Sequence, residues 1–204
     1  MSEKNSNYKQ KSILVGGAFS NTQYLWVLIL MFKYCNINNI KNIIFENEIS
    51  EDIINSKYLK KEFKKFNIIL KKKNYFLLIL EFIIYYSFNF ILDIKNDKNF
   101  KKQFNYSFSD TCRLKNNKNF YNISYVTKIK SILILFSQYT FINKLLKNYY
   151  IKDVFYGHSV YQYRLTLSLF KSKKVNFFVQ ANNSLYKTNI HNEVRWDFLD
   201  TYKY

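Results

Sequence analysis

Short apolar runs and longer segments of helical periodicity alternate along the chain. Five of these runs are rich in Ile, Val or Phe and are bounded by turn or polar residues, a pattern typical of buried β-strands. The first run ends in Gly16-Gly17, where we expect a tight turn. The predicted strands cover residues 12–15, 40–45, 67–70, 153–156 and 175–179.

Between the runs, apolar residues recur at the spacing of amphipathic helices. Helices are predicted over residues 23–35, 50–66, 75–92, 126–148 and 160–171. A repeated strand–turn–helix–strand order favours parallel pairing, because a crossover helix returns the chain to the same end of the sheet. The predicted fold class is therefore α/β, a Rossmann-like parallel sheet with helices on both faces.

The domain organisation follows from length and polarity. A chain of 204 residues suffices for one well-buried domain. Residues 1–11 form a polar tail, residues 12–196 the Rossmann-like domain, and residues 197–204 the start of a further interdomain region. Residues 95–122 are rich in Asn and Lys, and we expect them to be mostly loop.

The most apolar stretch, YFLLILEFIIYYSFNFIL at residues 75–92, has about the minimum length needed to cross a bilayer. Glu81 near its middle and Asn89 oppose a span, because an ionised carboxylate inside a membrane costs about 3 kcal/mol. Lysines flank both ends, so the charges indicate no direction of insertion. We expect a helix that lies against the domain or on a bilayer surface and does not span.

The net charge of +18 invites a nucleic-acid or membrane partner, but only three of the 32 basic residues are arginines. Proline, alanine, glycine and arginine are scarce together while Lys, Asn, Ile, Phe and Tyr are abundant. That bias is typical of an AT-rich genome. Nucleic-acid readers need arginine forks for phosphate and guanine, so no specific nucleic-acid partner is expected.

Cys35 and Cys112 lie far apart without metal-ligand spacing, and the chain has only two histidines, His158 and His191. We therefore expect no metal site and no cofactor. The polar N-terminus has no signal-peptide core. We therefore expect a cytoplasmic protein with reduced thiols, either free in the cytoplasm or peripheral on the inner face of the membrane.

Residues 153–187 carry the strongest candidate chemistry. In open parallel sheets, ligands bind beyond the carboxyl ends of the strands, where helix N-termini offer free N–H groups. His158 follows the strand end at Gly157, Tyr161 and Arg164 follow on the next helix, and Asn182 follows the next strand. We expect the four side chains to line one crevice, with His158 as a base. The alternative is that His158 caps its helix and Tyr161 packs.

Two segments resemble bacterial capsule and surface-polysaccharide biosynthesis proteins, glycosyltransferases of the GT-B type. One is DVFYGHSVYQYRLTLSLFKSKKVNFFVQANNSLYK at residues 153–187, with His158, Tyr161 and Arg164. The other is FSDTCR at residues 108–113, which is similar to a "G-D-x-I-Y-D-T-x-x-R" element without its glycine and first Asp. The loop at Gly16 and Gly17 fits that family's first strand and loop.

The resemblance implies an acceptor-binding N-terminal half whose nucleotide-sugar donor sits on a second half, which does not follow here. The chain would then be a fragment, a split gene product or a stand-alone domain. The implied catalytic residues are His158 and Asp110, and the implied substrate-binding residues are Tyr161, Arg164, Asn182, Gly16, Gly17 and Arg113.

Two functions therefore stand beside each other. The first is surface or capsular polysaccharide biosynthesis, with a glycan or lipid-linked acceptor as partner. The alternative is a peripheral membrane-associated basic scaffold protein that holds anionic lipid through residues 75–92 and the lysines. A basic nucleic-acid binder that stacks bases on its aromatic residues is a third and less favoured reading.

Overall fold

The centre of the computed structural model is a six-stranded sheet in the order β3-β2-β1-β4-β5-β6. Five strands run parallel, and β6 is antiparallel to β5 at the edge. The structure describes residues 11–16, 25–46, 55–70, 74–116, 123–156, 162–170, 175–181 and 184–188. The strands are β1 (Lys11–Gly16), β2 (Asn42–Phe45), β3 (Asn67–Leu70), β4 (Tyr150–Tyr156), β5 (Asn176–Ala181) and β6 (Ser184–Thr188).

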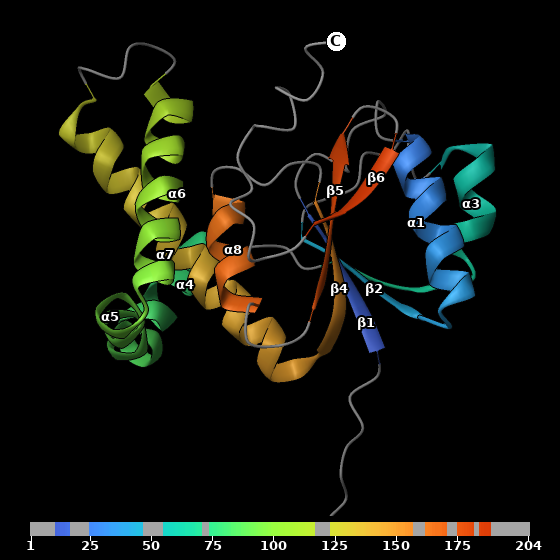
Figure 1. Ribbon diagram of the computed structural model, residues 1–204, viewed down its shortest axis with the longest axis horizontal. Coiled ribbons are helices and arrows are strands. Elements are labelled where there is room, and N and C mark those ends of the chain that lie inside the picture. The colour runs from blue at the N-terminus through green and yellow to red at the C-terminus, as the bar shows by residue number, and fades with distance from the viewer. Residues whose placement is uncertain are drawn as a thin grey trace, which may run out of the picture.

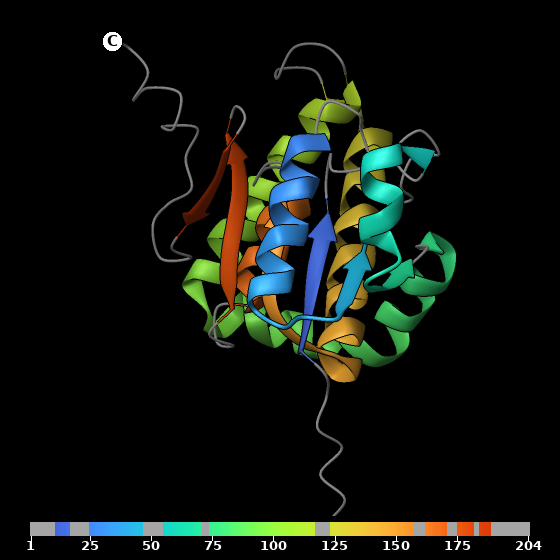
Figure 2. The same ribbon diagram turned by 90° about the vertical axis from the view of Figure 1, so that its right-hand side faces the viewer.

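Helices cover both faces of this sheet, as Figure 1 shows with the sheet seen nearly edge-on. Helices α1 and α3 lie on one face and stand in front of the strands in Figure 2, while the remaining helices lie on the other face. The fold is therefore the Rossmann-like α/β arrangement that the sequence predicts. The helices are α1 (Leu25–Ile37), α3 (Lys57–Phe63), α4 (Tyr75–Glu81), the π-helix η3 (Phe82–Tyr86), α5 (Ser87–Asn96), α6 (Lys98–Asn116), α7 (Tyr125–Asn148) and α8 (Gln162–Phe170).

Alternation of side chains along the central strands separates the two faces. In β1, Ile13 and Val15 pack with α1 on one side, whereas Leu14 packs with α7 and α8 on the other. All three side chains are buried. A fully apolar run thus suits a strand that helices cover on both faces.

A third apolar cluster lies outside the sheet, among the helices of the second face. Most of its members are aromatic, and Phe82 stacks on Phe136 with ring centroids 4.1 Å apart. The cluster ties η3, α5 and α6 to α7 and α8. Its buried members are Phe82, Phe90, Phe100, Leu135, Tyr139 and Leu165.

Four predicted strands, at residues 12–15, 40–45, 153–156 and 175–179, are confirmed as parallel neighbours. The loop expected over residues 95–122 is wrong, because α6 occupies most of it. The Asp97 carboxylate accepts hydrogen bonds from the N–H groups of Asn99 and Phe100 and so begins that helix. Beyond the strand predicted at residues 175–179, β5 continues to Ala181, and β6 follows as a strand that the sequence pattern does not predict.

Candidate functional site

The strand order reverses between β1 and β4, and the carboxyl ends of these two strands define the candidate site. The chain runs from β1 outward to β3 and then returns to place β4 on the other side of β1. Gly16 and Tyr156 are register partners at this end of the two strands. A crevice outside the strand ends at such a reversal is where open α/β sheets bind ligands.

Gly16 has a steric role at this edge. A Cβ atom on residue 16 would overlap the ring of Tyr156 and the carboxylate of Glu46. Any other residue would force one of these two groups to move. The sequence predicts Gly16 as part of a ligand loop, and in the structure it is the last residue of β1 and makes room for buried neighbours.

A buried hydrogen-bond network joins the ends of β2 and β4 to α7 and α8. Glu46, which is 1% exposed, accepts one bond at Oε1 from Gln138 Nε2 (2.8 Å) and one at Oε2 from the Tyr156 hydroxyl (3.0 Å). Gln138 Nε2 also donates to Thr166 Oγ1 at 2.8 Å. Neutral donors on both oxygens offset the cost of burying a carboxylate. The network therefore braces the four elements that meet at the reversal.

Sequence reasoning missed this network. The signal was Glu46 itself, a carboxylate that follows a predicted strand directly and faces the same edge as the predicted crevice. Tyr156 is the last residue before Gly157 and His158. Through Tyr156, Glu46 positions the point at which β4 leads into the predicted site.

Most residues of the predicted crevice fall outside the described part of the chain. These are Gly17, His158, Tyr161 and Asn182. Arg164 lies in α8, whose side-chain packing is described at Leu165 and Thr166 but not at residue 164. The crevice of these residues stays a prediction, and the structure describes the sheet edge beside which it would form.

Asp110 and Arg113 are described and lie on α6. Their side chains form an i,i+3 ion pair with Oδ1 and Nη2 3.5 Å apart. Helix α6 packs on α7 and α8 and belongs to the outer layer, away from the sheet in Figure 1. A pair of this spacing stabilises a helix by about 0.2–0.5 kcal/mol, and the assignment of Asp110 and Arg113 to a ligand site stays a prediction.

A second polar cluster lies on the α1 face of β4. Asp153 is fully buried and accepts bonds from the Tyr34 hydroxyl (3.0 Å) and from Asn176 Nδ2 (2.7 Å). Burial, and then the charge of Asp153, raises the pKa of Tyr34 far above its usual range. The same two causes raise the pKa of the Cys35 thiol to about 12. Cys35 is therefore a protonated core residue at neutral pH and not a nucleophile.

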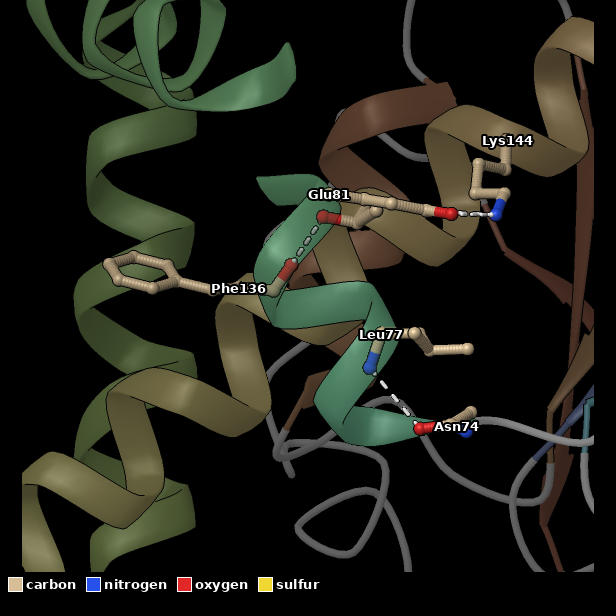
Figure 3. A network of polar contacts seen from close by, with 6 residues as sticks. Asn74, Leu77, Glu81, Phe136 and Lys144 are labelled. Carbon is tan, nitrogen blue, oxygen red and sulfur yellow. Dashed lines mark hydrogen bonds and ion pairs between the residues drawn. The ribbon is translucent and has the colours of Figure 1, made fainter. Parts of the chain in front are cut away.

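One groove among the described residues lies elsewhere, between α4 and α7, with a volume of about 200 Å³. The Glu81–Lys144 ion pair crosses it, and Asn74 caps α4 at its end through a 3.2 Å bond from the Leu77 N–H (Figure 3). None of its lining residues belongs to the predicted crevice. In the described part of the chain, no three His, Cys, Asp or Glu side chains gather as a metal site would require.

Comparisons with protein-family models, with curated proteins and with solved structures found no match for this chain. The fold and the site define the class of this protein as a Rossmann-like α/β domain, in which a buried hydrogen-bond network holds the carboxyl ends of the strands. The resemblance to polysaccharide glycosyltransferases rests on the residues of segments 108–113 and 153–187 alone.

Proposed function

We propose that this domain is the acceptor-binding half of a glycosyltransferase of surface-polysaccharide biosynthesis. The observation that carries the proposal is the strand reversal, which pairs Gly16 with Tyr156 at the carboxyl edge. Gly157 and His158 follow Tyr156 directly in the sequence, and the carboxyl edge at which β4 ends is where such sheets bind ligands. A glycan or lipid-linked acceptor would occupy this edge.

In this proposal His158 is the general base. A neutral imidazole near the acceptor accepts the proton of the attacking hydroxyl while that oxygen bonds to the donor sugar and the nucleotide leaves. Arg164 binds a phosphate of the acceptor or donor through its planar fork. The proposal gives no role to Asp110 and Arg113, which are bonded to each other on α6.

The brace around Glu46 supports the proposal through preorganisation. A base must be held close to its reacting position, and residues that lock its supporting backbone contribute to rate without touching substrate. Glu46 and Gln138 fix Tyr156, two residues before His158. They are positioning residues in this scheme.

The test uses the fact that the chain has only two histidines. Imidazole proton resonances would be followed by NMR while a hexose 1-phosphate is added to the full chain up to roughly millimolar concentration, the range in which weak sites fill. His158→Ala and His191→Ala assign the two signals. We expect the His158 signal to move and the His191 signal to stay.

A panel of hexose 1-phosphates and glycerol phosphates would be tested in the same way. If none of them shifts the His158 signal, the binding role of His158 is overturned. With a donor-binding half supplied, His158→Ala is expected to lower kcat about 100-fold, as loss of a general base does, while His191→Ala leaves kcat unchanged. Equal turnover by both variants would remove the catalytic role.

A further inference from the structure

The continuous helix of α4, η3 and α5 carries two apolar stripes, and only one of them is covered. Leu78, Phe82 and Phe90 are buried against the domain, and half-buried Tyr86 completes a series with a step of four residues. The second stripe, which we call the outer stripe, also steps by four and is exposed. Its members are Phe76, Leu80, Ile84, Phe88 and Leu92.

The π-helix reduces the angle through which both stripes wind around the helix axis. In an α-helix, positions four apart drift by about 40° per step around the axis, so five such positions would wrap most of the way around to the other side. The wide turn over Phe82–Tyr86 takes more residues per turn and cancels part of this drift. The inner stripe therefore stays on the domain, and the outer stripe stays in solvent along the whole helix.

The outer stripe differs from scattered exposed apolar residues because its members are neighbours on one helix. Phe76 is 70% exposed and Phe88 71%, and Ile83 and Ile91 beside them are also exposed. By length and composition Tyr75–Asn96 could cross a membrane, yet only 17% of its most apolar window is buried within the described structure. A contiguous apolar surface of this kind marks an interaction site.

Both carboxylates within the helix are held by α7, away from the outer stripe. Lys144 Nζ lies 2.7 Å from both Glu81 oxygens, as Figure 3 shows, and the Tyr139 hydroxyl donates to Asp93 at 2.6 Å. These bonds and the buried inner stripe fasten the helix lengthwise to the domain. A helix that spans a bilayer would have to give up all of them.

Lysines flank the helix in the sequence. Residues 71–73 are three lysines that precede Asn74, and at the other end Lys95 of α5 and Lys98 and Lys101 at the start of α6 are exposed. Lysines that flank an apolar helix face reach phosphate headgroups while the apolar face enters the acyl boundary. Against a second copy, either orientation of the two helices would bring lysines next to lysines in a chain of net charge +18.

We propose that the outer stripe is a docking surface for the face of an anionic lipid bilayer, with the helix lying in the plane of the membrane. The apolar side chains enter the acyl boundary, and the exposed Lys95, Lys98 and Lys101 bind lipid phosphates. The proposal does not depend on the glycosyltransferase assignment.

The test is sedimentation of the full chain with vesicles of phosphatidylcholine, with and without phosphatidylglycerol. The stripe variant Phe76→Ser/Ile84→Ser/Phe88→Ser is compared with the matched control Val126→Ser, an exposed apolar residue on α7. We expect the stripe variant to lose at least about tenfold in partition onto anionic vesicles and the control to bind as the parent does.

A second arm removes the charge through Lys95→Gln/Lys98→Gln/Lys101→Gln, which should weaken binding on the order of 100-fold because each lysine near an anionic surface contributes separately. Alkaline carbonate should release the parent protein. Phe88→Ser alone serves if the triple stripe variant does not fold, and its partition must also fall.

Three results would overturn the proposal. Equal vesicle binding by the stripe variant and the parent would show that only non-specific charge attraction holds the protein on the vesicles. Retention in the lipid pellet through carbonate would show a span. A parent dimer that the stripe variant converts to monomer, without vesicle binding by either, would make the occupant a second copy of the chain.

Discussion

The central strands and the α4–η3–α5 helix are built from the same kinds of residue and end in opposite environments. Ile13, Leu14 and Val15 of β1 are buried, because helices cover both faces of the strand. In the helix, Phe82 is 5% exposed while Phe88, only six residues on, is 71% exposed. The helix has the domain on one side and no described element on the other.

This difference shows that an apolar run becomes core only where the topology supplies a partner for every face. A strand between two parallel neighbours receives its covering helices from the crossover connections themselves. The helix after β3, made of α4, η3 and α5, faces the domain with one side. In the described part of the chain, no crossover connection covers its other side. Its apolar composition is therefore evidence for a partner outside the fold, whereas that of β1 is evidence for the fold.

The sharpest way to break this comparison is to truncate both sides of the helix. Phe82→Ala removes a ring stacked on Phe136 and in edge contact with Phe90 and Tyr139, and should lower the free energy of unfolding by about 3–5 kcal/mol. Phe88→Ala should change it by no more than about 0.5 kcal/mol, because its ring is already in water and alanine favours helix. Urea unfolding monitored by circular dichroism measures both.

A loss for Phe88→Ala as large as that for Phe82→Ala would show that the outer stripe is covered in solution. In that case sedimentation velocity would be expected to show an oligomer. The two variants change the same residue type in the same helix, so helix propensity cancels between them.

The sheet could be predicted from the sequence, whereas α6 and β6 could not, and the reason is the balance of local signals. The strands of the sheet are short Ile, Val and Phe runs next to turn residues, which few other structures accept. In α6 the buried Phe100 and Cys112 are separated by many Lys and Asn residues. The polar composition of the segment therefore hid the helical spacing of its buried residues. Strand β6 lies at the sheet edge and pairs with β5. Its sequence, SLYKT, has no apolar face by which a strand could be recognised.

The candidate site was only partly accessible to sequence reasoning for a different reason. Glycines and histidines after a strand can be recognised locally, as Gly16 and His158 were. The network of Glu46, Gln138, Tyr156 and Thr166 contains hydrogen bonds between residues up to 110 positions apart, and no local pattern brings them together. Only the strand order places β2, α7 and α8 at one edge.

Alkaline pH tests a polar attachment of the same helix, the bond from Tyr139 to Asp93. Burial first, and then this bond, raises the pKa of Tyr139 above its ordinary value of about 10. Above that pH the unfolded chain loses the phenolic proton and the folded protein keeps it. The unfolded state then binds fewer protons, so the free energy of unfolding falls as pH rises, by up to about 1.4 kcal/mol per pH unit. Below about pH 10 the contribution is fully present.

Urea unfolding from about pH 8 to about pH 11 would measure this slope. Tyr139→Phe should flatten it, and the slope that remains would include Tyr34, whose pKa is raised in the same direction. Tyr85→Phe is the matched control, because Tyr85 is an exposed tyrosine on η3, the helix segment that packs on α7. Identical pH slopes for Tyr139→Phe and the parent would contradict the assignment.

The smallest effect is expected at the ion pair between Glu81 and Lys144, which fixes the rotation of the helix on α7 (Figure 3). Both side chains are partly exposed, so the pair should contribute no more than about 1 kcal/mol, and Glu81→Gln should cost this much or less. Glu62→Gln is the matched control, because Glu62 forms an equally short local pair with Lys65, just past the C-terminal end of α3. Global stability should barely separate the two variants, but hydrogen exchange should. Glu81→Gln removes a tie between residues 63 positions apart and should speed exchange across α4, whereas Glu62→Gln should affect only the end of α3. Unchanged exchange in α4 would mean that the buried inner stripe alone holds the helix with its outer stripe facing away from the domain.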